Sequence, residues 1–210
     1  DELIIATRIK TTNENLSGRG LARLDDMRVH FVECPDFTTP KQVLKNKSNL
    51  HKILENAIRN ANIVFVRVSG SIAIEAAKIA KKNNVPCLVE VVTCAKDVYW
   101  NHSIKGKIAM PIMYLQMKRV VYQADYVQYI TSDFLQKRYP TKGVEYVCSN
   151  ALIRQMSDDE LQNRMEKYSN SLKSKKISIA TVGTISVDYK GQQDVIKALK
   201  ILNNEGIDIY

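Results

Sequence analysis

Two glycines and a lysine near the end of the chain have a spacing that suits a diphosphate. The stretch ISIATVGTISVDYKGQQDVIKAL predicts a buried strand that ends at Gly183 and Thr184, followed by a polar loop. Lys190 and Gly191 then open a helix. Backbone amides and the positive end of the helix dipole meet at such a corner, so a phosphate is favoured there and the lysine can balance its charge. The same spacing also fits a plain strand-to-helix turn, with the lysine in solvent.

A second group of chemically capable side chains follows an apolar strand near the middle of the chain. The segment TCAKDVYWNHSIKGK, residues 93–107, comes directly after the carboxyl end of that strand, where open α/β sheets bind ligands. It contains Asp97, Tyr99, Trp100, Asn101 and His102. Aromatic rings can stack on apolar sugar faces while polar groups bind hydroxyls, so this segment predicts a sugar-binding cleft. The alternative is an ordinary loop with Trp100 in the core and His102 exposed.

The segment that follows is both basic and apolar. Between Val98 and Ala124 there are four cations (Lys105, Lys107, Lys118 and Arg119) and no acid. An apolar helix edged by lysine and arginine can rest on an anionic membrane, where each cation contributes roughly 1 kcal/mol. The alternative is a core helix with solvated lysines. A further basic run, Lys41 to Lys52, is typical of a solvated helix face.

Several familiar chemistries lack their sequence signals. The motifs GxGxxG and GxxxxGK[ST] are absent, which removes the main support for a nicotinamide-cofactor or P-loop site. No GxSxG elbow is present for a serine nucleophile. Four scattered cysteines without a CxxC pair suggest neither a zinc site nor a disulfide framework, and a reducing compartment is favoured. We therefore expect no metal.

The elements that position these groups alternate between strands and helices. Strands are predicted at residues 3–7, 28–33, 63–68, 87–92, 126–130, 145–147 and 177–182, with helices near 43–58, 72–80 (capped by Ser71), 161–172 and 195–202. Residues 10–26 are polar and without a period, which indicates a loop or a small excursion whose role the sequence does not reveal. Alternation of this kind implies parallel strands joined by crossover helices. The predicted fold class is α/β, a Rossmann-like parallel sheet with helices on both faces.

Length and charge limit the domain organisation and the class of partner. The chain has 210 residues and a net charge of +9, which favours polyanionic partners without choosing among them. Neither end looks like a natural terminus, so we expect a piece of a longer protein. We expect a Rossmann-like domain over residues 1–150, a linker helix over 151–175, and the beginning of a second Rossmann-like domain over 176–210. No stretch reaches the roughly 20 apolar residues that span a bilayer.

The chain resembles the retaining nucleotide-sugar glycosyltransferases of the two-Rossmann (GT-B) type, the large group 1 or family 4 class. The resemblance covers about residues 60–210. It is carried most specifically by Ala124-Asp125, Thr131-Ser132, Ser149-Asn150, Gly183-Thr184 and Lys190-Gly191. It implies an acceptor-side first domain and a donor-binding second domain, of which only the start is present here.

Within that family, the resemblance implies that Lys190, Gly191 and the Gly183-Thr184 backbone hold the donor diphosphate. Many members have arginine where this chain has Thr184. Many also have a His-Gly after the strand ending at Val92, where this chain has Thr93-Cys94, so Thr93 joins Asp97, Tyr99, Trp100 and His102 as the acceptor or donor-sugar cleft. The paired-glutamate element of the family would fall beyond Tyr210, and no catalytic residue is assigned.

The implied activity is transfer of a sugar from a nucleotide-diphosphate donor to a saccharide or lipid-linked saccharide, with retention, in cell-surface polysaccharide synthesis. It implies no cofactor and no required metal, and the isolated chain is expected to be inactive. The expected location is the cytoplasm, peripheral on the inner face of the membrane. The alternative is a non-catalytic basic Rossmann-like module that binds a phosphorylated ligand or nucleic acid, although no RNA-binding motif is present.

Overall fold

A computed structural model describes residues 1–9, 26–37, 39–151, 154–173, 179–183 and 190–207. The chain divides into two compact units, Asp1–Asn150 and Ala151–Tyr210, and each is described by itself. The loop expected at residues 10–26 lies outside the described residues except for Asp26. The roles assigned to the two units, acceptor side and donor side, stay predictions.

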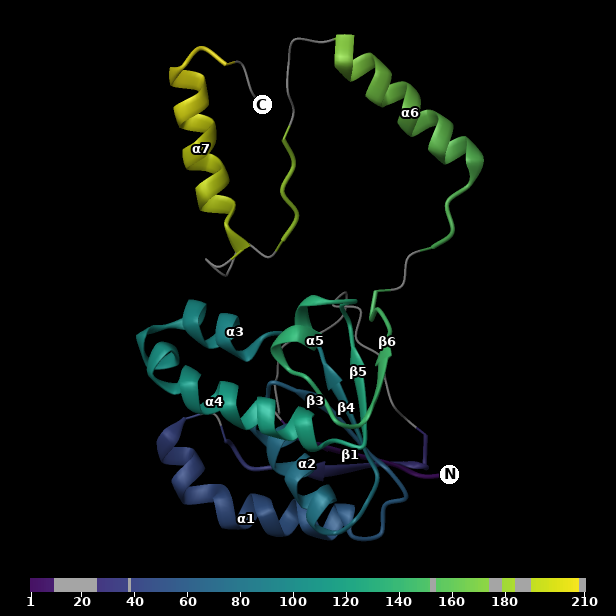
Figure 1. Cartoon of the computed structure of the whole chain (residues 1–210), viewed down its shortest axis with the longest axis vertical. Coiled ribbons are helices and arrows are strands. Elements are labelled where there is room, and N and C mark those ends of the chain that lie inside the picture. Colours follow the sequence, from purple (N-terminus) through teal and green to yellow (C-terminus); the bar gives the residue numbers. More distant parts are fainter. Residues whose placement is uncertain (10–25, 38, 152–153, 174–178, 184–189, 208–210) are drawn as a thin grey trace. The chain divides into compact units, whose positions relative to one another are not determined.

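The first unit alternates strands and helices (Figure 1). Its elements are β1 (Leu3–Thr7), β2 (Val29–Glu33), α1 (Pro40–Ile58), β3 (Val64–Val68), α2 (Ser71–Lys82), β4 (Cys87–Val91), α3 (Ala95–His102), α4 (Ile104–Gln123), β5 (Tyr126–Tyr129), α5 (Phe134–Arg138) and β6 (Val144–Val147). One sheet has the order β1-β2 and the other β3-β4-β5-β6, and every pair of neighbours is parallel. The predicted α/β class, with parallel sheets flanked by helices, is confirmed.

The core lies where α2 and α4 pack on the larger sheet. Side chains with almost no exposed surface come from strands and helices alike: Val68, Val89, Val91, Val127, Ile74, Ile79, Met117 and Val121. Each such side chain removed from water contributes roughly 1.5–3 kcal/mol before chain entropy is counted. The packing fixes the strand ends, and with them the loops that carry the candidate site.

Local signals set where the helices start. Helix α1 begins with a capping box, because the Gln42 amide donates to Thr39 Oγ1 at 3.3 Å while the Thr39 amide donates to Gln42 Oε1 at 3.0 Å. The expectation that Ser71 caps α2 is wrong. Gly70 is the N-cap residue, because its backbone is still extended, and the helical conformation begins at Ser71.

The two sheets are separated at their facing edges. A groove of about 930 Å³ lies between β1 and β3 and is lined by side chains such as Ile4, Ile63 and Phe65. Along β3, Val64, Val66 and Val68 are buried whereas Phe65 is exposed, so this edge strand alternates instead of being buried throughout.

The second unit contains helices α6 (Asp158–Lys173) and α7 (Gln192–Asn204). The strand expected at residues 177–182 is not found in its described part: residues 179–182 carry no strand, and residues 177 and 178 lie outside the described residues. A strand requires a neighbour with which to exchange backbone hydrogen bonds, and the described residues of this unit include none.

The four cysteines are all free thiols. Cys34, Cys87 and Cys94 are buried and Cys148, just after β6, is exposed. Burial raises the pKa of Cys34, and burial together with the negative charge of Asp125 raises that of Cys87 to about 12. Neither is therefore a thiolate at neutral pH.

Candidate functional site

The loops that follow β3, β4, β5 and β6 all leave the same edge of the larger sheet, because its strands are parallel. These loops are Ser69–Gly70, Val92–Cys94, Ile130–Asp133 and Cys148–Asn150. In open α/β sheets, ligands bind in the crevice at this carboxyl edge. The sequence-predicted residues Thr93 and Asp97 lie here, Thr93 in the loop and Asp97 in the first turn of α3.

The buried Tyr139 links the connection after β4 to the connection after β5. The Tyr139 hydroxyl accepts a hydrogen bond from the Ala95 amide at 2.9 Å, at the start of α3. The Tyr129 hydroxyl, at the end of β5, donates to the Tyr139 carbonyl at 2.5 Å. Burial raises the pKa of Tyr139 well above its ordinary value, so its hydroxyl stays protonated. The start of α3 is therefore held rigidly against the chain that follows α5.

Arg138 is a site residue that the sequence interpretation missed. Its Nη1 lies 3.1 Å from Cys94 Sγ and 3.2 Å from Asp97 Oδ1. The Cys94 sulfur and then the Asp97 carboxylate raise the pKa of the guanidinium, which is a permanent cation at this edge. The guanidinium carbon Cζ also lies over the Phe134 ring, 4.8 Å from the ring centre. The signal that could have found it was a cation in the connection after β5, facing an acid in the connection after β4.

Helix α3 directs its candidate side chains to different neighbours. Asp97 contacts Arg138, whereas the hydroxyl of half-buried Tyr99 makes a hydrogen bond with Ser71 at the start of α2. Burial raises the pKa of Tyr99 and the Ser71 hydrogen bond opposes that shift. Trp100 is 50% exposed with Lys107 Nζ 5.1 Å from its ring centre, so the loop with Trp100 in the core, the alternative interpretation, is wrong. His102 closes α3, and its side chain lies outside the described part.

The site at the edge of the first unit is therefore split. Asp97 and Arg138 form a charged pair, and Tyr99 lies beside the turn at Gly70. Charged and hydroxyl groups of this kind can bind the hydroxyls of a sugar or an anionic group. That the cleft binds an acceptor or donor sugar stays a prediction.

The second unit brings Gly183 to the start of α7. A Cβ atom at Gly183 would lie 2.8 Å from Gln192 Nε2 and 3.7 Å from the Cβ and Cγ atoms of Lys190. Gly191 is the N-cap residue of α7 with φ of +78°, a conformation that glycine adopts without strain. Thr184 lies outside the described residues. Gly183 and Lys190, which are separated by a loop in the sequence, thus lie close together at the start of α7.

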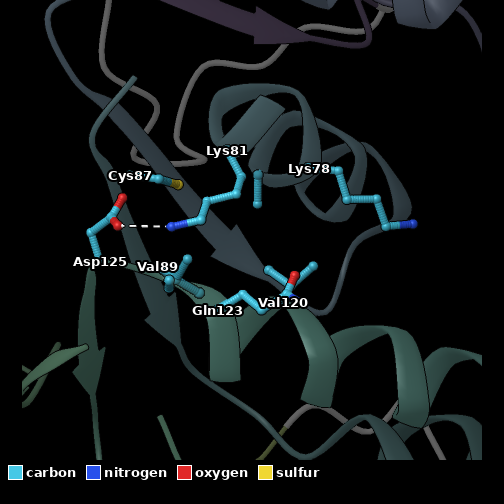
Figure 2. Close-up of a pocket in the computed structure, with 9 residues that line it drawn as sticks. Lys78, Lys81, Cys87, Val89, Val120, Gln123 and Asp125 are labelled. Atoms are coloured by element: carbon cyan, nitrogen blue, oxygen red, sulfur yellow. Dashed lines mark hydrogen bonds and ion pairs between the residues drawn. The ribbon is translucent and has the colours of Figure 1, made fainter. Parts of the chain in front are cut away.

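A small pocket at the opposite edge of the larger sheet is a poor candidate site. It has a volume of about 30 Å³, room for one water molecule, and is lined by residues such as Cys87, Val89 and Gln123. Lys81 Nζ reaches Asp125 Oδ1 at 3.2 Å across its mouth (Figure 2). The ion pair satisfies both charges, and the pocket lies where the strands begin rather than where they end.

Among the described residues, no group of three or more histidine, cysteine, aspartate or glutamate side chains could hold a metal ion. No described helix has both the length and the apolar character needed to cross a bilayer.

No protein-family model matches the chain. The chain is similar to Protein CapJ of Staphylococcus aureus, with 33% identity over 213 residues. The similarity covers all of this chain and 51% of CapJ, so the chain spans about half the length of the curated relative it matches.

Proposed function

We propose that this chain is part of a retaining glycosyltransferase of the two-Rossmann type. The complete protein would transfer a sugar from a nucleoside-diphosphate sugar to a saccharide or lipid-linked saccharide. The similarity to CapJ along the whole chain supports a role in capsular or other cell-surface polysaccharide synthesis. The observation that carries the proposal is the proximity of Gly183 to Lys190 at the start of α7.

The chemistry follows from the charge that develops on the leaving group. When the bond from the sugar to the diphosphate breaks, negative charge builds on the phosphate oxygens. An ammonium group at Lys190 and the positive end of the 13-residue helix α7 would offset that charge. Gly183 lacks a Cβ, which allows the backbone to approach a phosphate closely. The Asp97–Arg138 pair and Tyr99 would contact the sugar or acceptor hydroxyls.

The test is a substitution of Lys190 in the complete protein, with a matched lysine as control. Lys190→Ala is expected to lower kcat/KM by roughly tenfold or more, because a charge contact of the transition state is lost. Lys197 lies within α7, with its Nζ 3.4 Å from Asp194 Oδ1, and Lys197→Ala is expected to leave kcat/KM within about twofold. Equal effects of the two substitutions would contradict the assignment of Lys190.

A binding assay separates this proposal from a non-catalytic module. The complete protein is titrated with UDP- and GDP-sugars and with a short RNA at two salt concentrations. A transferase should bind one sugar nucleotide selectively and saturably. RNA binding that falls steeply with salt, without sugar-nucleotide binding, would overturn the proposal.

A further inference from the structure

The outer face of α4 carries apolar side chains that the fold does not use. Ile104, Ile108, Ile112 and Leu115 are between 61% and 78% exposed. At about 100° per residue they form one stripe along the helix, which Tyr122 continues. The opposite face, with Met117, Val120 and Val121, is buried in the core. Packing within the first unit therefore explains one face of α4 and leaves the other apolar and exposed.

Cations edge this stripe. Lys105 lies on one side of it and Lys107 and Lys118 lie on the other, while Arg119 falls within it near the end of the helix. All four side chains are exposed. The absence of any acid from Val98 to Ala124 gives the segment a charge of +4. The combination of an apolar centre with a basic edge is typical of helices that lie in a lipid interface.

Aromatic rings with lysines above them occur along the same face. Lys107 Nζ lies 5.1 Å from the Trp100 ring centre near the start of the stripe, and Lys142 Nζ lies 4.8 Å from that of Tyr122 at its end. Tryptophan and tyrosine favour the headgroup level of a bilayer, because one part of the ring is apolar and the other polar. Lysines can extend from that level to lipid phosphates.

The charge decides among possible occupants. A second copy of the chain that docked through the same face would bring four cations against four cations, which is unfavourable without intervening acids. An anionic lipid surface supplies the negative charge and the apolar layer together. A helix of 20 residues is about 30 Å long and can lie flat in the interface.

We propose that the outer face of α4, with Trp100 and Tyr122 at its two ends, docks the protein on an anionic membrane surface. The apolar stripe would enter the boundary between headgroups and acyl chains, while Lys105, Lys107 and Lys118 contact lipid phosphates. This inference rests on the first unit alone and is independent of the transferase proposal.

The test measures binding of the purified 210-residue chain to vesicles by sedimentation. Vesicles of phosphatidylcholine with phosphatidylglycerol are compared with vesicles of phosphatidylcholine alone. We expect binding to the anionic vesicles, little binding to the neutral ones, and a decrease as salt is added. Equal binding to both vesicles, or binding to neither, would overturn the proposal.

Matched variants locate the surface. Lys105→Ser with Lys107→Ser is expected to weaken vesicle binding roughly tenfold or more, and Ile108→Ser should weaken it several-fold. The controls are Lys45→Ser with Lys47→Ser, and Leu44→Ser, on the exposed face of α1. They remove the same charge and an equally exposed apolar side chain elsewhere, so vesicle binding should not change. All of these side chains are exposed, so the variants should keep the fold.

Three results would remove the assignment of this face to the membrane. If the α1 controls weaken vesicle binding as much as the α4 variants, general positive charge is responsible. If light scattering shows a dimer that Ile108→Ser dissociates, the face belongs to a second copy. If a short RNA binds as tightly as the vesicles and the same α4 variants abolish its binding, the face belongs to nucleic acid. Each of these results overturns the membrane proposal.

Discussion

The two units of the chain use the same kind of helix in different ways. In the first unit, α1 and α2 place residues such as Leu54 and Ile79 in a core that β3, β4 and β5 complete. In the second unit, α6 has apolar residues at comparable helical spacing, including Leu161, Met165 and Tyr168, and all of these are exposed. Neither α6 nor α7 has a buried residue. The comparison shows that local signals suffice to start a helix, whereas burial of its apolar face requires another element to pack against.

The largest expected difference concerns leucine truncation. Leu54, in α1, is 1% exposed, and Leu54→Ala should lower the free energy of unfolding of the first unit by about 2–5 kcal/mol. Leu161, in α6, is 59% exposed, and Leu161→Ala should change the stability by less than about 0.5 kcal/mol. Urea denaturation followed by Trp100 fluorescence measures the first unit, because Trp100 is the chain's one tryptophan. A similar shift of the midpoint by both variants would break the comparison.

An intermediate effect is expected at the two capping boxes. Helix α6 has one of its own: the Glu160 amide donates to Ser157 Oγ at 3.2 Å and the Ser157 amide donates to Glu160 Oε2 at 3.0 Å. Thr39→Ala should destabilise the first unit by about 1 kcal/mol, because α1 is part of its core. Ser157→Ala should speed amide exchange in the first turn of α6 without moving the fluorescence midpoint. Ser171→Ala, late in α6, is the control and should leave that first turn unchanged.

The smallest expected effect is a pH dependence of helix-start stability. The capping box of α6 should show it, and the capping box of α1 should not. The Arg154 guanidinium, followed by the Ser157 amide, lowers the pKa of Glu160 below its ordinary value of about 4.5. The stabilisation is therefore complete above that ordinary value and is lost as the pH falls through the lowered value of the folded state. Amide exchange in the first turn of α6, corrected for its intrinsic pH dependence, should rise over that interval, and Glu160→Gln should remove the change. The box at Thr39 contains no carboxylate, so a similar rise at the start of α1 would contradict this account.

The sequence predicted most of the strands because their signal is local. β-branched runs bounded by turn residues placed β1 without error and β2 to β5 to within one residue at either end. Helix α3 was not predicted, because AKDVYWNH has no apolar repeat of helical spacing. It is held by the Ala95 amide on Tyr139 and by Asp97 on Arg138, contacts to residues more than 40 positions away. Contacts of this kind are invisible to a reading of neighbouring residues.

The candidate site likewise has one part that neighbouring residues predict and another that depends on distant contacts. The corner formed by Gly183, Lys190 and Gly191 could be proposed from the sequence because its parts lie close together along the chain. The partnership of Arg138 with Asp97 could not, since it depends on which strands are neighbours in the sheet. The dispersal of Asp97, Tyr99 and Trp100 around α3 could not be predicted either, because the segment was not recognised as a helix.

The thiol of Cys148 is accessible to labelling reagents, whereas the thiols of the other three cysteines are buried. Because Cys34, Cys87 and Cys94 are buried, a maleimide reagent should modify the sulfur at the end of β6 selectively in the native protein. A spin label there, paired with a second label on an introduced cysteine in α7, would report the distance between the two units by electron paramagnetic resonance. A change in that distance on addition of a sugar nucleotide would reveal closure of one unit on the other.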